Sequence, residues 1–364
     1  MARTNLTEPP KIHRIPQPKF IDAIRWLPSP SPFRKSFISS LFDSDFHTPS
    51  LEIHSLDPSK TLTTPLLSWT PPSRISSLKS TPSLFAASTF LGSLHIFKTP
   101  EEMSVLGNDM SGLGGETSVM EPVVSVVGRE FHVGSIGGVD LMEGGSECVS
   151  VGEDGRVNLV VEKGGFRRVF DGNGLVSYSA VKWASPSEFV TGGCGFGLQW
   201  WDLRQPGAAV AQFKGSCLCC RDRGTTSGII HSIDIHPSRK HTCLAGGSSG
   251  TVFAWDLRRQ QEPIILSSIG SSDTMTQPLS ESEVWEVQYD YYTKSLNSNI
   301  SSSRILPAMI CSEDGILAVI EQGEEPTELL AEPCAINSFD IDRQNPSDVI
   351  CSLEWESIVI LSRP

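Results

Sequence analysis

The sequence repeats one short unit, a turn that ends in glycine followed by a run of apolar residues, and this repetition constrains the fold most. The unit is clearest in three segments: VGEDGRVNLVV (151–161), GGSSGTVFAWD (246–256) and CSEDGILAVIE (311–321). The glycines of these turns are Gly155, Gly250 and Gly315. Glycine favours tight turns, and a short apolar run between turns favours a buried strand, so each unit predicts a turn that leads into a strand.

Four weaker copies bring the number of units to seven. The equivalent positions, five residues after the turn in the clear copies, are His54, Phe97, Val160, Trp201, Trp255, Ile320 and Leu361. Their basal spacing of roughly 40 residues is the length of a four-stranded propeller blade. We therefore predict an all-β fold, a seven-bladed β-propeller that spans residues 1–364 as a single domain.

The wider spacings contain segments rich in turn-forming residues. We predict flexible loops near 100–122, 214–228, 268–282 and 292–303. These loops are either plain connections or partner contacts, because loops on a rigid scaffold often carry binding.

The ring must also close. If each repeat begins with the outer strand of the preceding blade, an N-terminal strand must complete the last blade. The segment KIHRI (11–15) is the candidate, and its pairing would protect an edge that could otherwise aggregate.

The charge of the chain argues against direct binding of nucleic acid. The formal net charge is −13 over 364 residues. Neutralising phosphates requires clustered Lys and Arg, and the sequence has no basic stripe. The local pair Arg258 and Arg259 is interpreted as a solvated loop end, because charged side chains usually face water.

The number and placement of the cysteines, together with the absence of a secretory signal, predict a protein of a reducing compartment. The nine cysteines are odd in number, and several lie in apolar runs, where a free thiol packs as a small hydrophobic group. The opening MARTNLTEPP has no apolar core of a signal peptide. No run approaches the roughly 18 apolar residues of a membrane helix, so we expect no membrane insertion.

Two tetrads resemble the signature of the WD-repeat family: Trp201-Asp202-Leu203-Arg204 and Trp255-Asp256-Leu257-Arg258. The turns GEDG (152–155) and SEDG (312–315), which contain Asp154 and Asp314, resemble the acidic turn of the same family. Within it, the order and spacing of VGEDGRVNL, HSIDIHPSRKHTCLAGGSSGTVFAWDLR, EVWEVQYD and CSEDG are similar to the WD-repeat nucleoporins of about forty-three kilodaltons. The resemblance covers essentially the whole chain, strongly in 130–260 and 283–320 and weakly in 30–125.

The resemblance implies a non-catalytic, monomeric propeller that acts as a protein-binding scaffold. The implied location is the nuclear pore complex at the nuclear envelope. The implied partners are the other nucleoporins of the Y-shaped outer-ring subcomplex, and the process served is nucleocytoplasmic and messenger-RNA transport. The residues with implied structural roles are Trp201, Asp202, Trp255, Asp256, Asp154, Asp314, Gly155, Gly250 and Gly315.

The chain departs from the family pattern in its polar residues. Only two of the seven units carry Trp-Asp, and no unit has an evident complete His–Ser/Thr–Asp–Trp network. Asp154 and Asp314 have Val160 and Ile320 where the family has Trp. We therefore expect the blades to depend on apolar packing more than on polar networks.

Motifs that could indicate an enzyme or a metal site have simpler interpretations. GGSSG (246–250) fits the pattern of a nucleophile elbow, but a strand follows it and no histidine follows position 241. GGCGFG (192–197) precedes a strand and not the helix that a phosphate cradle needs. Structural zinc sites usually use C-x₂₋₄-C spacing, whereas the candidate cluster is Cys217, Cys219 and Cys220, with Cys194 and His231 as distant additions. Glu324 and Glu325 are interpreted as solvated. We predict no enzyme activity, no cofactor and no metal.

The tetrads also support an alternative function. W-D-x-R at the end of a blade strand resembles the box read by the adaptor of cullin-4 ubiquitin ligases. Arg204 and Arg258 would then donate bidentate hydrogen bonds to acidic groups of the adaptor. The competing interpretation is that these tetrads only end a strand.

Overall fold

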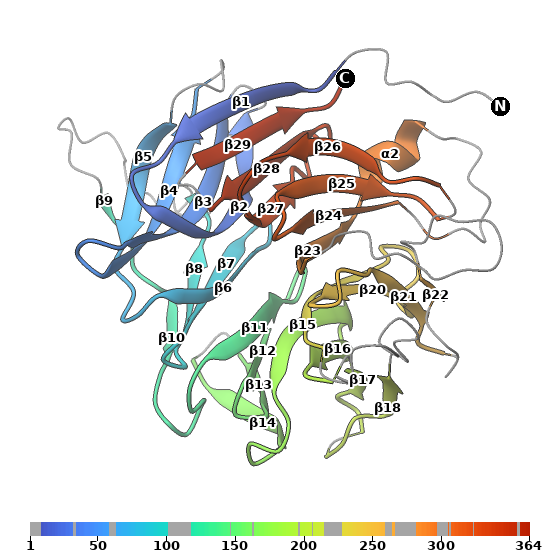
Figure 1. The fold of residues 1–364 in the computed structure, drawn as a ribbon. Coiled ribbons are helices and arrows are strands. Elements are labelled where there is room, and N and C mark those ends of the chain that lie inside the picture. Colours follow the sequence, from blue (N-terminus) through green and yellow to red (C-terminus); the bar gives the residue numbers. More distant parts are fainter. Residues whose placement is uncertain are drawn as a thin grey trace.

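Seven β-sheets follow one another along the chain and form a closed ring, which the computed structural model shows roughly along its axis in Figure 1. The all-β, seven-bladed prediction is therefore confirmed. The structure describes residues 9–31, 34–57, 63–100, 118–145, 147–161, 164–195, 197–205, 207–214, 228–258, 264–265, 282–296, 305, 307–322, 324–354 and 357–364. Most of the four predicted loops (101–117, 215–227, 266–281 and 297–304), with Cys217, Cys219, Cys220 and Arg259, lies outside the described residues.

The strands of the blades have the following bounds. Blade 1 contains β2 (Phe20–Ser31), β3 (Arg34–Asp43), β4 (Thr48–Leu56), β5 (Thr63–Trp69) and β9 (Ser118–Val119). Blade 2 contains β6 (Ile75–Ser80), β7 (Leu84–Thr89), β8 (Leu94–Lys98) and β10 (Val124–Val126). Blade 3 contains β11 (Ile136–Leu141), β12 (Cys148–Gly152), β13 (Arg156–Val160) and β14 (Phe166–Asp171). Blade 4 contains β15 (Tyr178–Ser185), β16 (Glu188–Gly193), β17 (Gly197–Asp202) and β18 (Ala211–Lys214).

The remaining blades complete the ring. Blade 5 contains β19 (Ile230–Ile235), β20 (Thr242–Gly247), β21 (Phe253–Asp256) and β22 (Ile264–Ile265). Blade 6 contains β23 (Val284–Tyr289), β24 (Ala308–Ser312), β25 (Ile316–Ile320) and β26 (Thr327–Ala331). Blade 7 contains β27 (Ile336–Ile341), β28 (Asp348–Leu353), β29 (Ser357–Ser362) and the N-terminal β1 (Lys11–Pro16).

The N-terminal strand closes the ring, as the sequence predicts. β1 pairs antiparallel with β29 over six residues, from Lys11 opposite Ser362 to Pro16 opposite Ser357. Ile15 is 5 % exposed and joins the apolar cluster between blades 7 and 1. Both ends of the chain therefore belong to one sheet, and β1 covers the edge of β29.

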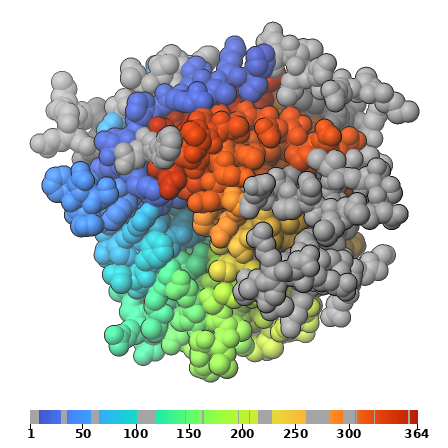
Figure 2. All heavy atoms as spheres, in the orientation of Figure 1, coloured from blue at the N-terminus to red at the C-terminus, as the bar shows by residue number. Residues whose placement is uncertain are grey.

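Apolar packing between neighbouring blades forms the core. There are seven clusters of buried hydrophobic residues among the described positions, one at each of the seven junctions between blades. The seven positions that the repeats define all lie on the third strand of their blade, and their side chains are at most 4 % exposed. Figure 2, drawn in the orientation of Figure 1, shows neighbouring blades in contact with one another.

Two short elements differ from the expected loops. Residues Tyr291–Leu296 form the helix α2 within the segment predicted as a loop near 292–303. Its first turn is fixed by Asp290, whose Oδ1 accepts a hydrogen bond from the Tyr292 N–H at 3.1 Å. Ser118–Val119, at the end of the segment near 100–122, forms β9 and pairs in parallel with β5 as the fifth strand of blade 1.

Candidate docking surfaces and the central channel

The ring has two faces, which are distinguished by the strand ends that they carry. The turn face is the side that carries the hairpin turns between the second and third strands of the blades, such as residues 152–156. The tetrad face is the side on which the third strands end, where Asp202 and Asp256 lie. The residues that the sequence singled out are divided between these two faces.

The three predicted turn glycines occupy a backbone conformation that other residues rarely adopt. Gly155, Gly250 and Gly315 have φ of 76°, 67° and 81° in equivalent turns. A Cβ at position 315 would also lie 2.0 Å from the carbonyl oxygen of Glu332. These glycines are therefore needed for the turns themselves.

Asp154 is the centre of a polar network in blade 3. Its Oδ1 lies 3.1 Å from His132 Nδ1, and its Oδ2 accepts a hydrogen bond of 2.8 Å from the Val133 N–H. The opposite nitrogen, His132 Nε2, lies 3.0 Å from Ser150 Oγ. Burial alone would raise the pKa of Asp154, but the hydrogen bonds from His132 and the backbone outweigh it and lower the pKa.

We expect Asp154→Asn to destabilise the protein at pH 7 by about 1–3 kcal/mol, because it weakens hydrogen bonds to buried partners. A carboxylate with a depressed folded-state pKa stabilises the fold above its unfolded pKa of about 3.9, and this contribution is lost as the pH falls through the lower folded value. Urea unfolding between pH 3 and pH 7 should therefore show a shallower acid loss in the variant. Glu153→Gln removes a charge from the same turn, but its side chain is exposed, so it should leave the curve nearly unchanged.

Other blades retain different parts of the same network. In blade 4 the Trp201 Nε1–H donates to Thr191 Oγ1 at 3.0 Å. In blade 6 the Ser312 hydroxyl donates to Asp314 Oδ1 at 2.5 Å. Trp201 and Trp255 are each 2 % exposed and pack between blades, where apolar contact stabilises them.

The two tetrads adopt the same local structure on neighbouring blades. Arg204 donates from Nε to Asp202 Oδ1 and from Nη2 to Asp202 Oδ2, both at 2.8 Å. Arg258 makes the same pair of bonds to Asp256 at 2.9 and 2.8 Å. The Arg side chains are 68 % and 63 % exposed, so each tetrad presents a guanidinium that its own aspartate already holds on one edge.

The inner strands line the channel with a second repeat that the sequence analysis missed. Each inner strand has a β-bulge near its start, after the first residue in six blades and after the second residue, Ile21, in β2. The position four residues after the one that precedes the bulge is polar in every blade: Arg25, Lys79, Asp140, Lys182, Asp234, Gln288 and Asp340. Aligning the inner strands on their bulges reveals this polar set of seven.

Carboxylates of this polar set connect one blade to the next. Asp140, Asp234 and Asp340 each accept a hydrogen bond of 2.8 Å from the backbone N–H of the following inner strand, at Trp183, Tyr289 and Trp26 respectively. Lys182 Nζ lies 4.0 Å from Asp140 Oδ1 and 3.5 Å from Asp234 Oδ1. These polar residues of the inner strands thus connect neighbouring blades through ion pairs and through hydrogen bonds from main-chain N–H groups.

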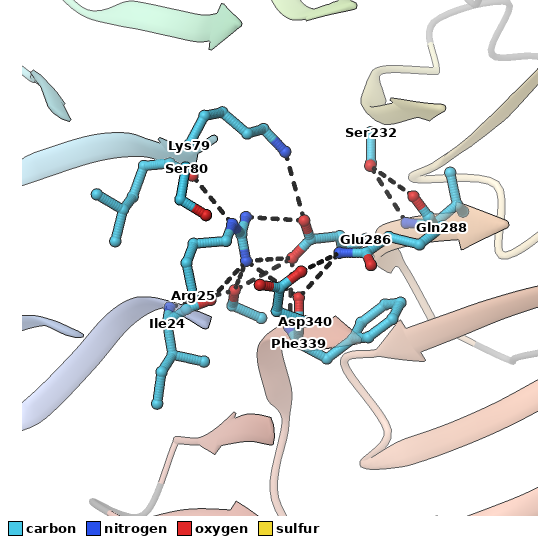
Figure 3. A network of polar contacts seen from close by, with 12 residues as sticks. Ile24, Arg25, Lys79, Ser80, Ser232, Glu286, Gln288, Phe339 and Asp340 are labelled. Carbon is cyan, nitrogen blue, oxygen red and sulfur yellow. Dashed lines mark hydrogen bonds and ion pairs between the residues drawn. The ribbon is translucent and has the colours of Figure 1, made fainter. Parts of the chain in front are cut away.

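A buried ion pair joins the inner strands of blades 1 and 6 (Figure 3). Arg25 from β2 donates to Glu286 of β23 at 2.7 and 3.1 Å, and their side chains are 9 % and 7 % exposed. Lys79 Nζ approaches the same carboxylate at 3.5 Å. Arg25 also donates to Ser338 Oγ at 2.7 Å and to the Phe339 carbonyl oxygen at 3.0 Å. Burial would raise the pKa of Glu286, but the two cations outweigh it and the pKa is lowered.

A cavity lies at each face of the ring, and we call these cavities the two mouths of the channel. The cavity at the tetrad face has a volume of about 640 Å³, and the cavity at the turn face about 540 Å³. Arg25 and Lys79 line both cavities. The tetrad-face cavity has a balanced set of charges, including Asp140, Lys182 and Asp234.

The described residues hold few features of a chemical site. They contain no group of three or more potential metal-ligating side chains. The six described cysteines form no disulfide with one another, and five of them are buried. No helix in the described part of the chain is long and apolar enough to span a membrane. The buried thiols of Cys148, Cys243 and Cys351 have raised pKa values because burial disfavours the thiolate.

Sequence comparison identifies one relative that matches nearly the whole chain and two that match about half of it. The chain is 58 % identical over 374 residues to the nuclear pore complex protein NUP43 of Arabidopsis thaliana, which covers 97 % of this chain and 98 % of that protein. It is 30 % identical over 172 residues to nucleoporin Nup43 of Mus musculus and 29 % identical over 172 residues to nucleoporin Nup43 of Homo sapiens. Each of these two matches covers 47 % of this chain and 38 % of the relative. No protein-family model matches the chain.

Proposed function

The chain belongs to the Nup43 family of nuclear pore proteins, and from this premise we propose that it is a non-catalytic structural nucleoporin that resides at the nuclear pore. We propose further that it joins the outer-ring subcomplex by stable contacts with other nucleoporins and so supports nucleocytoplasmic and messenger-RNA transport. The observation that carries the proposal is the 58 % identity over 97 % of the chain to a nuclear pore complex protein.

The architecture supports a scaffold function. The ring is closed by the pairing of β1 with β29, and a buried ion pair joins blades 1 and 6, so its surfaces are held rigidly relative to one another. A rigid disc offers two faces and a rim, and each is wide enough for a standard interface of roughly 800 Å² per partner. Binding to a preformed surface avoids much of the ordering cost of association.

Purification of the tagged full chain from cells at moderate salt, with quantitative mass spectrometry of the bound proteins, tests the proposal. We expect outer-ring nucleoporins in amounts comparable to the bait and a tagged protein located at the nuclear rim. A protein that is diffuse in the cell and recovers no nucleoporins would reject the scaffold function.

The exposed arginines of the tetrads support one competing function, that of a substrate receptor for a cullin-4 ligase. They lie on neighbouring blades of the same face, and each keeps donors that its own aspartate does not use. This function predicts recovery of a cullin-4 adaptor, and loss of that adaptor with Arg204→Ala and Arg258→Ala. If the double variant retains the nucleoporins and no adaptor is seen with either protein, the competing function is rejected.

A further inference from the structure

The turn face carries a line of exposed apolar side chains over blades 2 and 3. Phe90 and Leu91 lie in the hairpin turn of blade 2, Val133 lies in the loop before β11, and Leu175 lies in the loop before β15. They are 50 %, 71 %, 51 % and 90 % exposed. We call these four residues the apolar ridge. Adjacent exposed apolar residues often mark an interaction site.

Hydrogen-bonded turns hold the ridge in place. The Leu91 N–H donates to Ser73 Oγ at 3.2 Å, and the Val133 N–H donates to Asp154 Oδ2 at 2.8 Å. The Asp154 carbonyl oxygen accepts the Gly174 N–H at 3.1 Å, directly before Leu175. The turns of blade 2 and the loop before β11 also meet closely, because a Cβ on Gly92 would lie 2.7 Å from the Gly134 carbonyl oxygen. The ridge is therefore a preformed surface.

The ridge begins at the turn-face mouth of the channel. Phe90 lines the cavity of about 540 Å³ there, together with Phe20 and Trp285. The buried Arg25–Glu286 pair also lines this cavity. The mouth is thus a pocket of aromatic and polar groups at one end of an apolar surface.

Carboxylates dominate the mouth on the side opposite the ridge. Glu313 and Glu354 are exposed and line the cavity from blades 6 and 7. Glu283 lies beside them, with its Oε2 2.6 Å from His231 Nε2. Glu313 accepts a hydrogen bond of 2.6 Å from Trp285 Nε1–H, which holds the indole at the mouth.

Asp22 adds a carboxyl group, 11 % exposed, to this set. Its Oδ1 accepts a hydrogen bond of 2.7 Å from Arg74, and Arg74 is also held against the rings of Phe20 and Phe42. Its Oδ2 is buried without a hydrogen-bond partner among the described residues. The cations that line this cavity are Arg25, Lys79, Arg74 and, when protonated, His231, and each already has a carboxylate partner: Glu286, Asp22 or Glu283. The exposed carboxylates of Glu313 and Glu354 have no such cation partner among the described residues, so the outer part of the mouth is acidic.

We propose that the turn face docks a linear segment of a partner protein in which a Lys or Arg side chain enters the acidic mouth and neighbouring apolar side chains cover the ridge. The carboxylates select the cation, and the aromatic rings of Trp285 and Phe20 can contact its aliphatic stem and charged end. The apolar side chains gain by leaving water, and the fixed turns reduce the cost of ordering the site. This surface deepens the scaffold function by giving the chemistry of one partner segment.

Panning a random twelve-residue peptide library displayed on phage against the full chain, followed by affinity measurement with synthesised peptides, tests the surface. We expect selected peptides to combine a Lys or Arg with apolar residues and to bind more weakly as the salt concentration rises. Glu313→Lys with Glu354→Lys should weaken binding at least about tenfold by reversing the charge of the mouth, and Leu91→Asp should do the same through the ridge.

Glu324→Lys with Glu325→Lys is the matched control, because it makes the same charge change in an exposed turn of the tetrad face. It should leave the affinity unchanged, and the urea midpoints of all variants should match that of the parent. Peptides without a basic residue, equal loss in the control, or no selected peptide would overturn the proposal. Failure of the peptide experiment would not change the recovery of nucleoporins with the unaltered tagged chain. The scaffold function and this surface are therefore tested separately.

Discussion

Glu286→Gln is expected to destabilise the protein by about 3–5 kcal/mol, because it removes the only carboxylate that the described residues place against both Arg25 and Lys79. A buried guanidinium that loses its counter-charge keeps the cost of desolvation without the compensating attraction. The loss should appear as a lower urea midpoint with an unchanged slope. The fluorescence of the eight tryptophans can be used to monitor this unfolding.

The exposed pair of Arg343 and Glu143 provides the control. These side chains are 57 % and 71 % exposed, although they also make an ion pair of 2.5 Å. Glu143→Gln should therefore cost at most about 1 kcal/mol, because water and salt screen an exposed pair. If both variants lose the same small amount, the ion pair in the channel does not stabilise the ring.

Removal of residues 1–16 is expected to abolish the monomeric folded protein. The deletion takes away β1, exposes the whole edge of β29 and removes Ile15 from the cluster between blades 7 and 1. An uncovered edge strand pairs readily with other chains, so the deleted protein should aggregate or remain unfolded. Soluble yield, size-exclusion chromatography and circular dichroism measure this outcome.

Removal of residues 1–8 alone is the control, because β1 begins at Lys11 and its pairing with β29 remains. Ile15→Ala is a milder change at the same strand. It should lower the free energy of unfolding by about 2–5 kcal/mol, as other large-to-small substitutions of buried residues do. A monomeric 17–364 protein with a cooperative thermal transition would show that the ring does not depend on its closing strand.

The number of blades and one equivalent position in each could be predicted from the sequence because each blade repeats a local signal. A turn glycine such as Gly155 or Gly315 and the buried residue five positions later are fixed by local geometry and by period-2 burial. The closing strand could be predicted for a related reason, since one strand was left over and one blade was incomplete. The assignment of structural roles to Trp201, Asp202, Trp255 and Asp256 depended on the resemblance.

The polar network of Asp154 illustrates what local patterns leave out. Its partner His132 lies 22 residues earlier in the chain, in a loop without a periodic signal. Its position beside the turn is set by the packing of that loop on blade 3. The network could therefore be recognised only after the blade was assembled.

The sequence by itself determined the repeat, the all-β class, the closing strand and the membership of the family. Each of these follows from the spacing of nearby residues or from sequence similarity along the chain. Only the tertiary structure decided which charges meet in the channel. Arg25 and Glu286 are 261 residues apart, and closure of the ring brings them together. Likewise, the apolar ridge and the acidic mouth form one surface only because the hairpin turns of different blades project from the same face. Contacts between distant blades depend on the closed geometry of the ring, and no local pattern encodes that geometry.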